Sequence, residues 1–253
     1  MKRNVKKSNN SKRRNDFSEF IDGLIKKYED RPNSVIQINS LSNENTIEKR
    51  RLYDLLNVLA ACDICTKTDQ HNYIWNSIKN SKKAISRISY ELECRSINET
   101  TDEIFILHDS PSIGLVTTRF IGIFLYLNID TSNIRDAALF MSSDEPHYKT
   151  ILRRLYLVAF LLERIGLFTR TQKNGEYKLN VDVKSICIKS LEKLARAEEF
   201  PPDSIEYQLN RFDQNYLYQM HSARRFNFVD RETYFDTSST PGLAMSYIQG
   251  IDI

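Results

Sequence analysis

An internal repeat constrains this chain more than any other feature of its sequence. The run Arg50-Arg51-Leu52-Tyr53 returns 103 residues later as Arg153-Arg154-Leu155-Tyr156. At the same offset Leu59, Thr66 and Thr68 match identical residues, and apolar positions stay in phase without a gap over about 20 residues. A period of this length is too long for a solenoid. It predicts two copies of one small domain.

Each copy carries the same local pattern of one helix followed by two short strands. Apolar residues recur at helical spacing in the first copy (Leu52, Leu55, Leu56, Leu59) and in the second (Leu152, Leu155, Val158, Ala159, Leu162, Ile165). Asn45-Thr46 is expected to cap the first helix, and Gly166 to end the second in a left-handed conformation. The β-type runs that follow are Ile64–Lys67 with Tyr73–Trp75, and Leu167–Arg170 with Glu176–Leu179. Asn174-Gly175 between the second pair is typical of a hairpin.

Further helices are expected before these segments, which gives the skeleton of a winged helix-turn-helix in each copy. An apolar stripe runs from Phe17 to Tyr28, and the run Leu115–Leu127 precedes a capped segment over Thr131–Phe140. The predicted fold class is therefore mainly α with small β wings, with two winged helix-turn-helix domains in tandem. The expected divisions are a disordered basic arm at 1–15, domain one at 16–77, a linker at 78–110, domain two at 111–183, and a helix with an aromatic-rich tail at 184–253.

The segments outside the two copies give weaker patterns. A helix is predicted over Lys82–Cys94 and a strand over Glu103–Leu107, both inside the linker. An amphipathic helix is predicted over Ser185–Glu199, and Pro201-Pro202 ends it. Residues 203–253 receive no predicted fold. Their aromatic residues fit either a partner-binding segment or a disordered tail.

Composition excludes several classes of protein. The longest apolar run, Phe120–Leu127, is far shorter than the about 20 residues of a membrane-spanning helix, so no membrane association is expected. Four cysteines are too few for a disulfide scaffold, which favours a reducing compartment. Cys62 and Cys65 form a lone Cys-x-x-Cys without a second ligand pair, so they are predicted to be structural, with no metal and no cofactor. The four histidines are isolated and no phosphate loop occurs, so no enzyme is expected.

Positive charge is concentrated at the start of the chain. The net charge is only +3, yet the first 14 residues hold seven Lys and Arg and no acid. Such a segment does not bury, and it is typical of a nuclear-import signal or a phosphate-seeking arm, or else of a solubilising terminus.

The segment Glu48–Leu59 resembles the recognition helix of the E2-promoter-binding transcription factors and their dimerization partners, here called the E2-factor family. The shared signature is Arg-Arg-x-Tyr-Asp with a following Asn-Val-Leu, and Trp75 stands where the family closes its wing. In the second copy, Ser112–Ile121 resembles the start of the family's first helix, and Lys149–Tyr156 resembles the signature again. The resemblance covers roughly residues 16–76 and 112–180.

Two such domains in one chain resemble the atypical type of this family. The resemblance implies binding of double-stranded DNA without a separate dimerization partner, repression of cell-cycle genes in the nucleus, and sites similar to TTTCCCGC. The implied DNA-binding residues are Arg50, Arg51, Tyr53, Asp54 and Asn57 in the first copy, and Arg119, Arg153, Arg154 and Tyr156 in the second.

The chemistry of arginine fits this role. A guanidinium fork matches O6 and N7 of guanine in the major groove, and each bidentate contact contributes about 1–3 kcal/mol of discrimination. Tyr53 is suited to reach a phosphate, and Asp54 to orient an arginine. If the linker is flexible, its roughly 35 residues span about 30–35 Å, close to one turn of DNA.

The second copy departs from the signature. Asp54 and Asn57 correspond to Leu157 and Phe160, so a polar face has become apolar. Either the second copy still binds DNA while these two residues pack against the other domain or a partner, or it is only a dimerization or structural domain. A homodimer, or a dimerization-partner-like protein bound through domain two, therefore stays open.

A winged-helix module for protein–protein interaction, without specific DNA binding, is the main alternative, because this fold does not fix function. The near-neutral body and the apolar Leu157 and Phe160 favour it. The basic arm and the intact first signature favour DNA binding.

Overall fold

A computed structural model describes residues 17–45, 47–108, 110–197 and 214–236. The first unit begins with a helix over 17–29. It continues through β1 (Val35–Gln37), α2 (Ile38–Asn45), α3 (Lys49–Ala61), β2 (Cys65–Lys67) and β3 (Asn72–Trp75). The three strands form an antiparallel sheet in the order β1-β3-β2, with Val35 paired to Ile74 and Cys65 paired to Trp75. The predicted helix and hairpin of this copy are confirmed.

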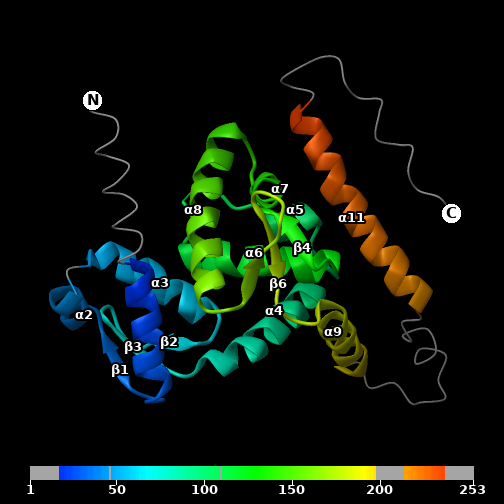
Figure 1. The fold of residues 1–253 in the computed structure, drawn as a ribbon. Coiled ribbons are helices and arrows are strands. Elements are labelled where there is room, and N and C mark those ends of the chain that lie inside the picture. The colour runs from blue at the N-terminus through cyan, green and yellow to red at the C-terminus, as the bar shows by residue number, and fades with distance from the viewer. Residues whose placement is uncertain (1–16, 46, 109, 198–213, 237–253) are drawn as a thin grey trace, which may run out of the picture.

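The second unit repeats this order of elements. It comprises α6 (Ile113–Leu127), β4 (Thr131–Asn133), α7 (Ile134–Phe140), α8 (Glu145–Arg164), β5 (Phe168–Arg170) and β6 (Glu176–Leu179). Its antiparallel sheet has the order β4-β6-β5, which corresponds strand by strand to β1-β3-β2. Gly175 has φ +80° at the turn before β6, as the Asn174-Gly175 pair predicts. Figure 1 shows the first unit in blue and cyan beside the second in green.

The strands β1 and β4 are absent from the sequence-based prediction. Thr131–Asn133, expected only to cap a helix, pairs with β6 before Asn133 accepts a hydrogen bond from the backbone N–H of Arg135. Each strand has three residues, which is too short for an alternating pattern to stand out. Pairing with a distant partner strand decides their conformation.

The helices α3 and α8, which carry the repeated signature, differ in how their ends are capped. Asp144 accepts from the backbone N–H of His147 and Pro146 stands in the first turn, so α8 begins well before its apolar stripe. Gly166, with φ +76°, follows its last turn as predicted. The expected cap of α3 at Asn45-Thr46 is wrong. The helix begins at Lys49, its N-cap is Glu48 without a side-chain cap bond, and Thr46 lies outside the described residues.

The linker predicted at 78–110 is largely folded, and the helix predicted over Lys82–Cys94 is present. It holds a 3-10 turn at Ile78–Asn80, α4 (Ser81–Arg95) and α5 (Thr101–Phe105), and α4 packs on α6. The strand expected over Glu103–Leu107 is wrong. Thr100 and Glu103 form a reciprocal capping box that starts α5, while Ile104 and Phe105 are buried in the core. The estimate of a 30–35 Å flexible tether, made at about 5–6 Å per square root of residue number, therefore fails.

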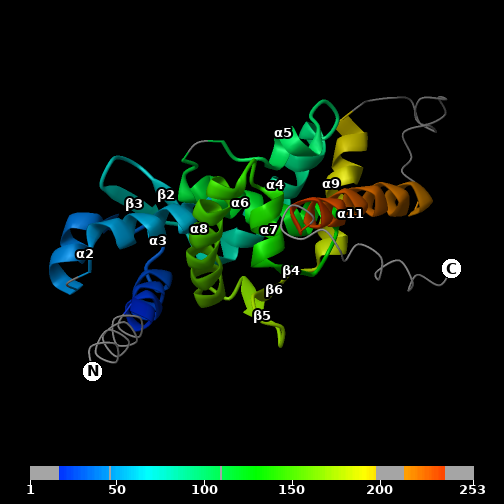
Figure 2. The same cartoon turned by 90° about the horizontal axis from the view of Figure 1, so that it is seen from above.

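Two C-terminal helices cover the second unit. The predicted amphipathic helix is confirmed as α9 (Val183–Ala197), which packs on α4 and α6. A further helix without a sequence-based prediction, α11 (Gln214–Asp236), packs on α6 and α7 (Figure 2). Its Arg224 forms a buried ion pair with Glu93 of α4, with two N–O distances of 2.8 Å. This part of the aromatic-rich segment is thus folded onto its own chain.

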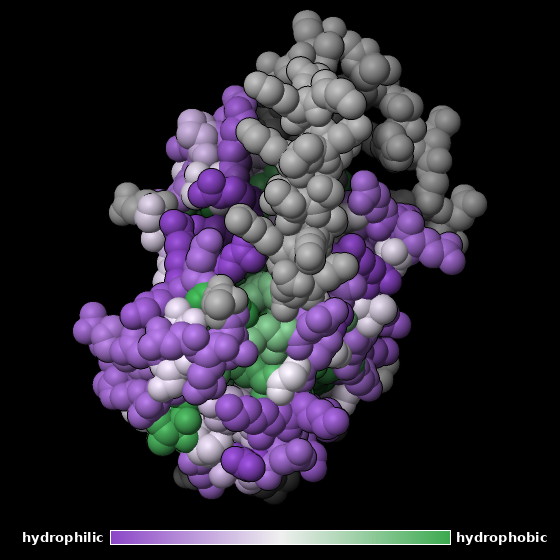
Figure 3. All heavy atoms as spheres, turned by 60° about the vertical axis from the view of Figure 1, so that its left-hand side comes forward, coloured by the Kyte–Doolittle hydropathy of each residue, from purple (hydrophilic) through white to green (hydrophobic). Residues whose placement is uncertain are grey.

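One hydrophobic core joins the two units. Its buried residues run from Phe17 to Cys187, and Trp75 and Phe120 are among the largest. In the surface view of Figure 3, the face shown is mostly hydrophilic, with hydrophobic side chains gathered in a strip near its centre. Within the described residues, no helix has the length and apolar character needed to cross a membrane. The predictions for the basic arm at 1–15 and for residues 198–213 and 237–253 lie outside the described residues.

Candidate nucleic-acid interface

The sequence of α3 divides the helix into a core face and an exposed face. Its buried side is formed by leucines and a valine (Leu52, Leu55, Leu56, Val58, Leu59). Lys49, Arg50 and Arg51 are exposed at its first turn. This division follows from the helical spacing of the apolar residues, and it leaves the two arginines of the first signature outside the core.

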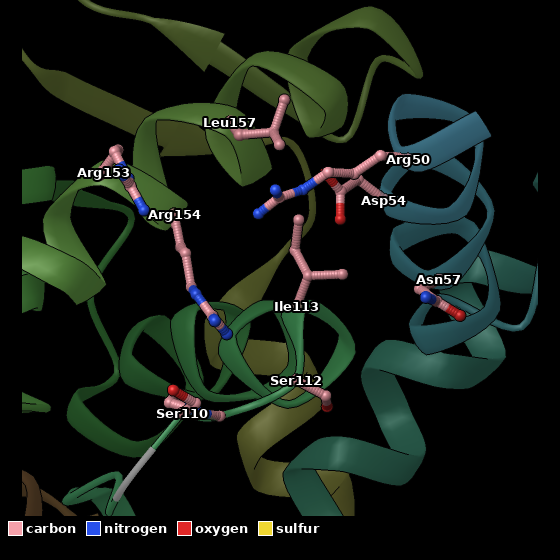
Figure 4. A pocket seen from close by; sticks show the side chains of 10 residues that line it. Arg50, Asp54, Asn57, Ser110, Ser112, Ile113, Arg153, Arg154 and Leu157 are labelled. Atoms are coloured by element: carbon pink, nitrogen blue, oxygen red, sulfur yellow. The ribbon is translucent and has the colours of Figure 1, made fainter. Parts of the chain in front are cut away.

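A pocket of about 640 Å³ lies between α3, α8 and the start of α6. Arg50, Asp54 and Asn57 line it from α3, and Arg153, Arg154 and Leu157 line it from α8. Residues Ser110, Pro111, Ser112 and Ile113 complete the lining. In Figure 4, Arg50 extends from α3 toward α8, and Arg154 extends toward the segment that carries Ser110 and Ser112. Signature residues far apart in the sequence therefore share one pocket.

Positive charge dominates this pocket. Three arginines line it against a single carboxylate, that of Asp54. Among the described residues, none of Arg50, Arg51, Arg153 and Arg154 takes part in an ion pair. Burial raises the pKa of Asp54 above its ordinary value, and the charges of Arg50 and Arg154 act against this rise. The carboxylate of the first copy thus faces arginines of both copies.

The other signature residues of α3 have specific neighbours. The guanidinium of Arg51 lies 5.5 Å from the ring centroid of Phe17, a distance typical of a cation–π contact. The Tyr53 hydroxyl is hydrogen-bonded to Nδ1 of His71 in the wing turn, at 2.5 Å. Asn57 accepts a hydrogen bond from the Tyr73 hydroxyl at 2.9 Å. The contacts of Tyr53 and Asn57 fix α3 against its own wing, and that of Arg51 joins α3 to the N-terminal helix.

Two predicted DNA-binding residues of the second copy, Tyr156 and Arg119, lie outside the pocket lining. Tyr156 is 45% exposed on α8, but it does not line the pocket. Arg119 is half-buried on α6 and also lies outside the lining, and its Nε has no hydrogen-bond partner among the described residues. Burial and the nearby Arg95 lower the pKa of Arg119 to about 10, while Glu99 and Glu91 oppose this shift. The structure therefore does not bring Arg119 together with Arg50, Arg153 and Arg154, and Arg51 also lies outside the pocket lining.

Reciprocal packing of the two units sets α3 beside α8. The N-terminal helix of the first unit reaches α8 through stacking of Phe17 on Phe160 and an ion pair between Asp22 and Arg164. In return, α6 of the second unit packs on α3, where a Cβ at Gly114 would lie 3.5 Å from the Asn57 carbonyl oxygen. The first helix of each unit thus contacts the recognition-helix segment of the other.

Sequence reasoning missed the part of the lining that comes from the loop before α6. No sequence pattern places Ser110, Pro111 and Ile113 beside the arginines, because their position in the lining results from packing between the units. Ser112 belongs to the segment that resembles the family's first helix, and its hydroxyl caps α6 at the N–H of Leu115. Of the lining residues, only those of the repeated signature were predicted from the sequence as DNA-binding residues.

The cysteine pair has a structural role, as predicted. Cys62 and Cys65 are buried free thiols, and burial raises the pKa of both to about 12. Both side chains belong to the hydrophobic core. Within the described residues, no group of His, Cys, Asp and Glu has the arrangement of a metal site.

Comparison with known proteins gives matches to one family. Residues 17–77 match the model of the winged-helix DNA-binding domain of the E2-factor/DP family. The chain is 20% identical over 192 residues to the E2-factor-like transcription factor E2FF of Arabidopsis thaliana, a match that covers 64% of this chain and 54% of the relative. It is 23% identical over 193 residues to the transcription factor E2F8 of Xenopus tropicalis, a match that covers 57% of this chain and 26% of the relative.

The chain therefore spans about half of the first relative and about a quarter of the second. The family model covers the first unit, and the second unit repeats its order of strands and helices. Both relatives are named as transcription factors. They support the E2-factor family and a winged-helix DNA-binding domain at residues 17–77 of this chain.

Proposed function

We propose that this chain is a sequence-specific regulator of transcription that binds double-stranded DNA in the nucleus through two winged-helix units, at 16–77 and 111–183. One observation carries the proposal. The two repeated signature helices, α3 and α8, present arginines without ion pairs to one shared pocket. Because no carboxylate engages these guanidinium groups, their hydrogen-bond donors stay available to an external acceptor such as a phosphate or a guanine edge.

The proposed readout is the recognition of guanine by guanidinium forks. Arg50 and Arg51 on α3, and Arg153 and Arg154 on α8, would contact adjacent G·C pairs of a GC-core element. Two bidentate contacts contribute about 2–6 kcal/mol of discrimination, and specific sites typically need about 4–10 kcal/mol. Contributions from both units are therefore expected. Tyr53 and Tyr156 would contact phosphates, and Asp54 would hold Arg50 in place.

The packing of the second unit argues against an interaction module. Leu157 and Phe160 favoured that alternative, because apolar side chains on a recognition helix suggest a protein partner. Phe160 stacks on Phe17 of the first unit, and Leu157 is partly buried against the common core. Part of their apolar surface is used within the chain, and we propose that the chain binds DNA without a homodimer or a separate dimerization partner.

The proposed effect on transcription is based on the resemblance to the atypical type of the E2-factor family. We propose that the chain represses cell-cycle genes through TTTCCCGC-like elements, and that the basic arm at 1–15 directs nuclear import or contacts phosphates. Arg119 is kept as a weaker candidate, because it lies outside the pocket.

A binding titration of the full chain tests the proposal. The unmodified chain should prefer a duplex with a GC core over a scrambled duplex at fixed salt. The double variant Arg50→Ala with Arg51→Ala should lose this preference, and Arg153→Ala with Arg154→Ala should weaken it less. The matched control is Lys82→Ala with Lys83→Ala on α4, which removes two exposed charges outside the pocket and should keep the preference. Equal losses in the two arginine variants would refute the ordering.

Salt dependence separates DNA binding from the alternative. Neutralisation of phosphates releases counterions, so the logarithm of affinity should fall steeply with the logarithm of salt concentration, by about 0.9 for each phosphate contacted. A module for protein interaction would show almost no duplex affinity and no such slope.

A further inference from the structure

One serine at the arginine pocket has the sequence context of a phosphorylation site. Of the six prolines in the chain, only Pro111 and Pro241 follow a serine or threonine. Ser110, directly before Pro111, is exposed and lines the pocket together with Arg50, Arg153 and Arg154. A serine followed by proline is the target pattern of proline-directed protein kinases. Ser110 therefore has both the target pattern of such a kinase and a position in the arginine pocket.

We propose that Ser110 is a phosphorylation site whose phosphate binds the pocket arginines and thereby switches off DNA binding. In the modification, the Ser110 hydroxyl oxygen bonds to the γ-phosphorus of ATP as the bond to the ADP oxygen breaks, and ADP and a proton are released. The regulatory consequence rests on the proposed function. The binding of the phosphate in the pocket does not depend on the proposed function.

The charges of the pocket favour such a group. A phosphoserine carries a charge of about −1.5 to −2 at pH 7 and three strong acceptor oxygens, and arginines bind it through charge-assisted hydrogen bonds. Figure 4 shows Arg154 directed toward the segment with Ser110 and Ser112. Arg154 and Arg153 take part in no ion pair among the described residues, so they need not leave a carboxylate in order to bind a phosphate.

The backbone near Ser110 favours the same charge. Ser110 lies two residues before Ser112, the N-cap of the 15-residue helix α6. A helix N-terminus carries a partial positive charge, which stabilises an anion close to its first turn. The one carboxylate in the lining, Asp54, stands on the opposite helix α3 beside Arg50. The phosphate would therefore meet attraction from α6 and α8.

The same arginines are proposed to read guanine, and this couples modification to function. A phosphate bound to Arg154 and Arg153 competes with DNA for these side chains and adds negative charge that repels the DNA backbone. Pro111 is buried, so a kinase must act while the segment before α6 is locally open. We expect loss of one or two arginine contacts to reduce affinity for the GC-core duplex about ten- to hundredfold.

The first experiment measures the phosphate directly in the full chain, without DNA. Phosphoserine is introduced at position 110 by genetic encoding, and its pKa is measured by phosphorus-31 NMR. Neighbouring arginines should lower that pKa by about one pH unit from its ordinary value of about 6. Arg154→Ala in the same chain should bring the pKa back toward 6. An ordinary pKa that Arg154→Ala leaves unchanged would overturn the proposed binding of the phosphate in the pocket.

The second experiment measures duplex binding. Phosphoserine at position 110 should weaken binding of the GC-core duplex about ten- to hundredfold. Phosphoserine at Ser86, which is exposed on α4 outside the pocket, should weaken it far less. Equal effects at the two positions, or unchanged affinity with phosphoserine at 110, would overturn the regulatory claim. If the unmodified chain bound no duplex, the proposed function would fail while the NMR result still decided the pocket.

The third experiment tests the modification. A purified proline-directed kinase with ATP should add a phosphate to Ser110 of the full chain, located by peptide mass spectrometry, and Ser110→Ala should abolish this peptide's mass shift. Absence of phosphate at Ser110 after the kinase has acted would overturn the assignment of the site.

Discussion

Phe17 and Phe160 stack with their ring centroids 6.4 Å apart and their planes inclined by 25°, and they join the first unit to α8 of the second. Phe17 also supports the Arg51 guanidinium at 5.5 Å from its ring centroid. One aromatic contact therefore links the interface between the units to a signature arginine. Asn57 stands at the repeat position of Phe160 in α3, so this contact has no counterpart in the first copy.

Removal of this contact should destabilise the whole chain. Phe17→Ala or Phe160→Ala removes a large ring from the interface, and we expect each to lower the free energy of unfolding by about 2–4 kcal/mol. The double variant should reveal a coupling of about 0.5–1.5 kcal/mol between the two rings. Urea denaturation of the four proteins measures this coupling. A control at Ile97, which is 65% exposed, should change stability by less than about 0.5 kcal/mol on replacement by alanine. Strictly additive losses would show that the rings do not interact.

Asp54→Asn should separate selectivity from overall affinity. The substitution removes the one carboxylate of the pocket lining, so Arg50 loses its charged neighbour while the net positive charge of the pocket rises. We expect the preference for a GC-core duplex over a scrambled one to fall about tenfold, with affinity for the scrambled duplex unchanged or higher.

Glu48→Gln is the matched control for Asp54→Asn. It removes one negative charge at the start of α3, outside the pocket lining, and should raise affinity for both duplexes alike. A preserved preference in Asp54→Asn would contradict the role assigned to this carboxylate.

Glu29 should make stability depend on pH. Its carboxylate accepts hydrogen bonds from Trp75 Nε1 at 3.0 Å, from the Ser77 hydroxyl at 2.7 Å and from the Ile78 N–H at 3.1 Å. Burial acts to raise the pKa of Glu29, but these hydrogen bonds and the charge of Lys79 outweigh it and lower the pKa below its ordinary value of 4.5. The stabilisation that the ionised Glu29 contributes is therefore present above its unfolded-state pKa of 4.5. It is lost as the pH falls through the lowered pKa of the folded state.

The corresponding variant is Glu29→Gln. Near pH 7 the free energy of unfolding of this variant should be about 1–2 kcal/mol lower than that of the unmodified chain. The reason is that a charged carboxylate accepts stronger hydrogen bonds than a neutral amide oxygen does. The difference from the unmodified chain should shrink as the pH falls below 4.5, as measured by urea denaturation at a series of pH values. Glu19→Gln, exposed on the same helix, should show no such trend. A difference that stays constant with pH would exclude the carboxylate as its source.

The buried ion pair between Arg224 and Glu93 should hold α11 in place. Arg224 also donates to the Tyr126 carbonyl and the Ser96 hydroxyl, and its guanidinium lies 4.0 Å from the Tyr126 ring centroid. Arg224→Met leaves Glu93 buried without its charge partner, at an expected cost of about 3–5 kcal/mol. Combined with Glu93→Leu, the loss should be clearly smaller. Hydrogen exchange in α11 should rise in the single variant and fall back in the double. Equal exchange in both variants would show that the pair does not hold this helix.

Prediction from sequence was most successful where the structure is local. Helical spacing of leucines, Gly166 and Asn174-Gly175 depend on residues a few positions apart, and the helices and hairpins they predict are present. The failures have non-local causes. The strands β1 and β4 form only by pairing with β3 and β6, and Glu103–Leu107 becomes a helix start because Thr100 and Glu103 cap each other while Ile104 and Phe105 reach the core.

The candidate site was found in part. The repeated Arg-Arg signature led to Arg50, Arg153 and Arg154, which line one pocket, whereas Arg119 followed the same resemblance and lies elsewhere. Ser110 could not be found in this way, because no motif links it to arginines more than 40 residues away. Only the packing of α6 between α3 and α8 brings them together.

The amino-acid sequence alone determined that this chain contains one pattern twice, with an arginine pair on an amphipathic helix in each copy. Such patterns act over one or two helical turns and need no partner segment. The tertiary structure decided that the two helices face a common pocket, that the expected tether is a folded part of the core, and that α11 covers the second unit. These features depend on contacts between residues distant in the chain, whose free energy arises only when both surfaces leave water together.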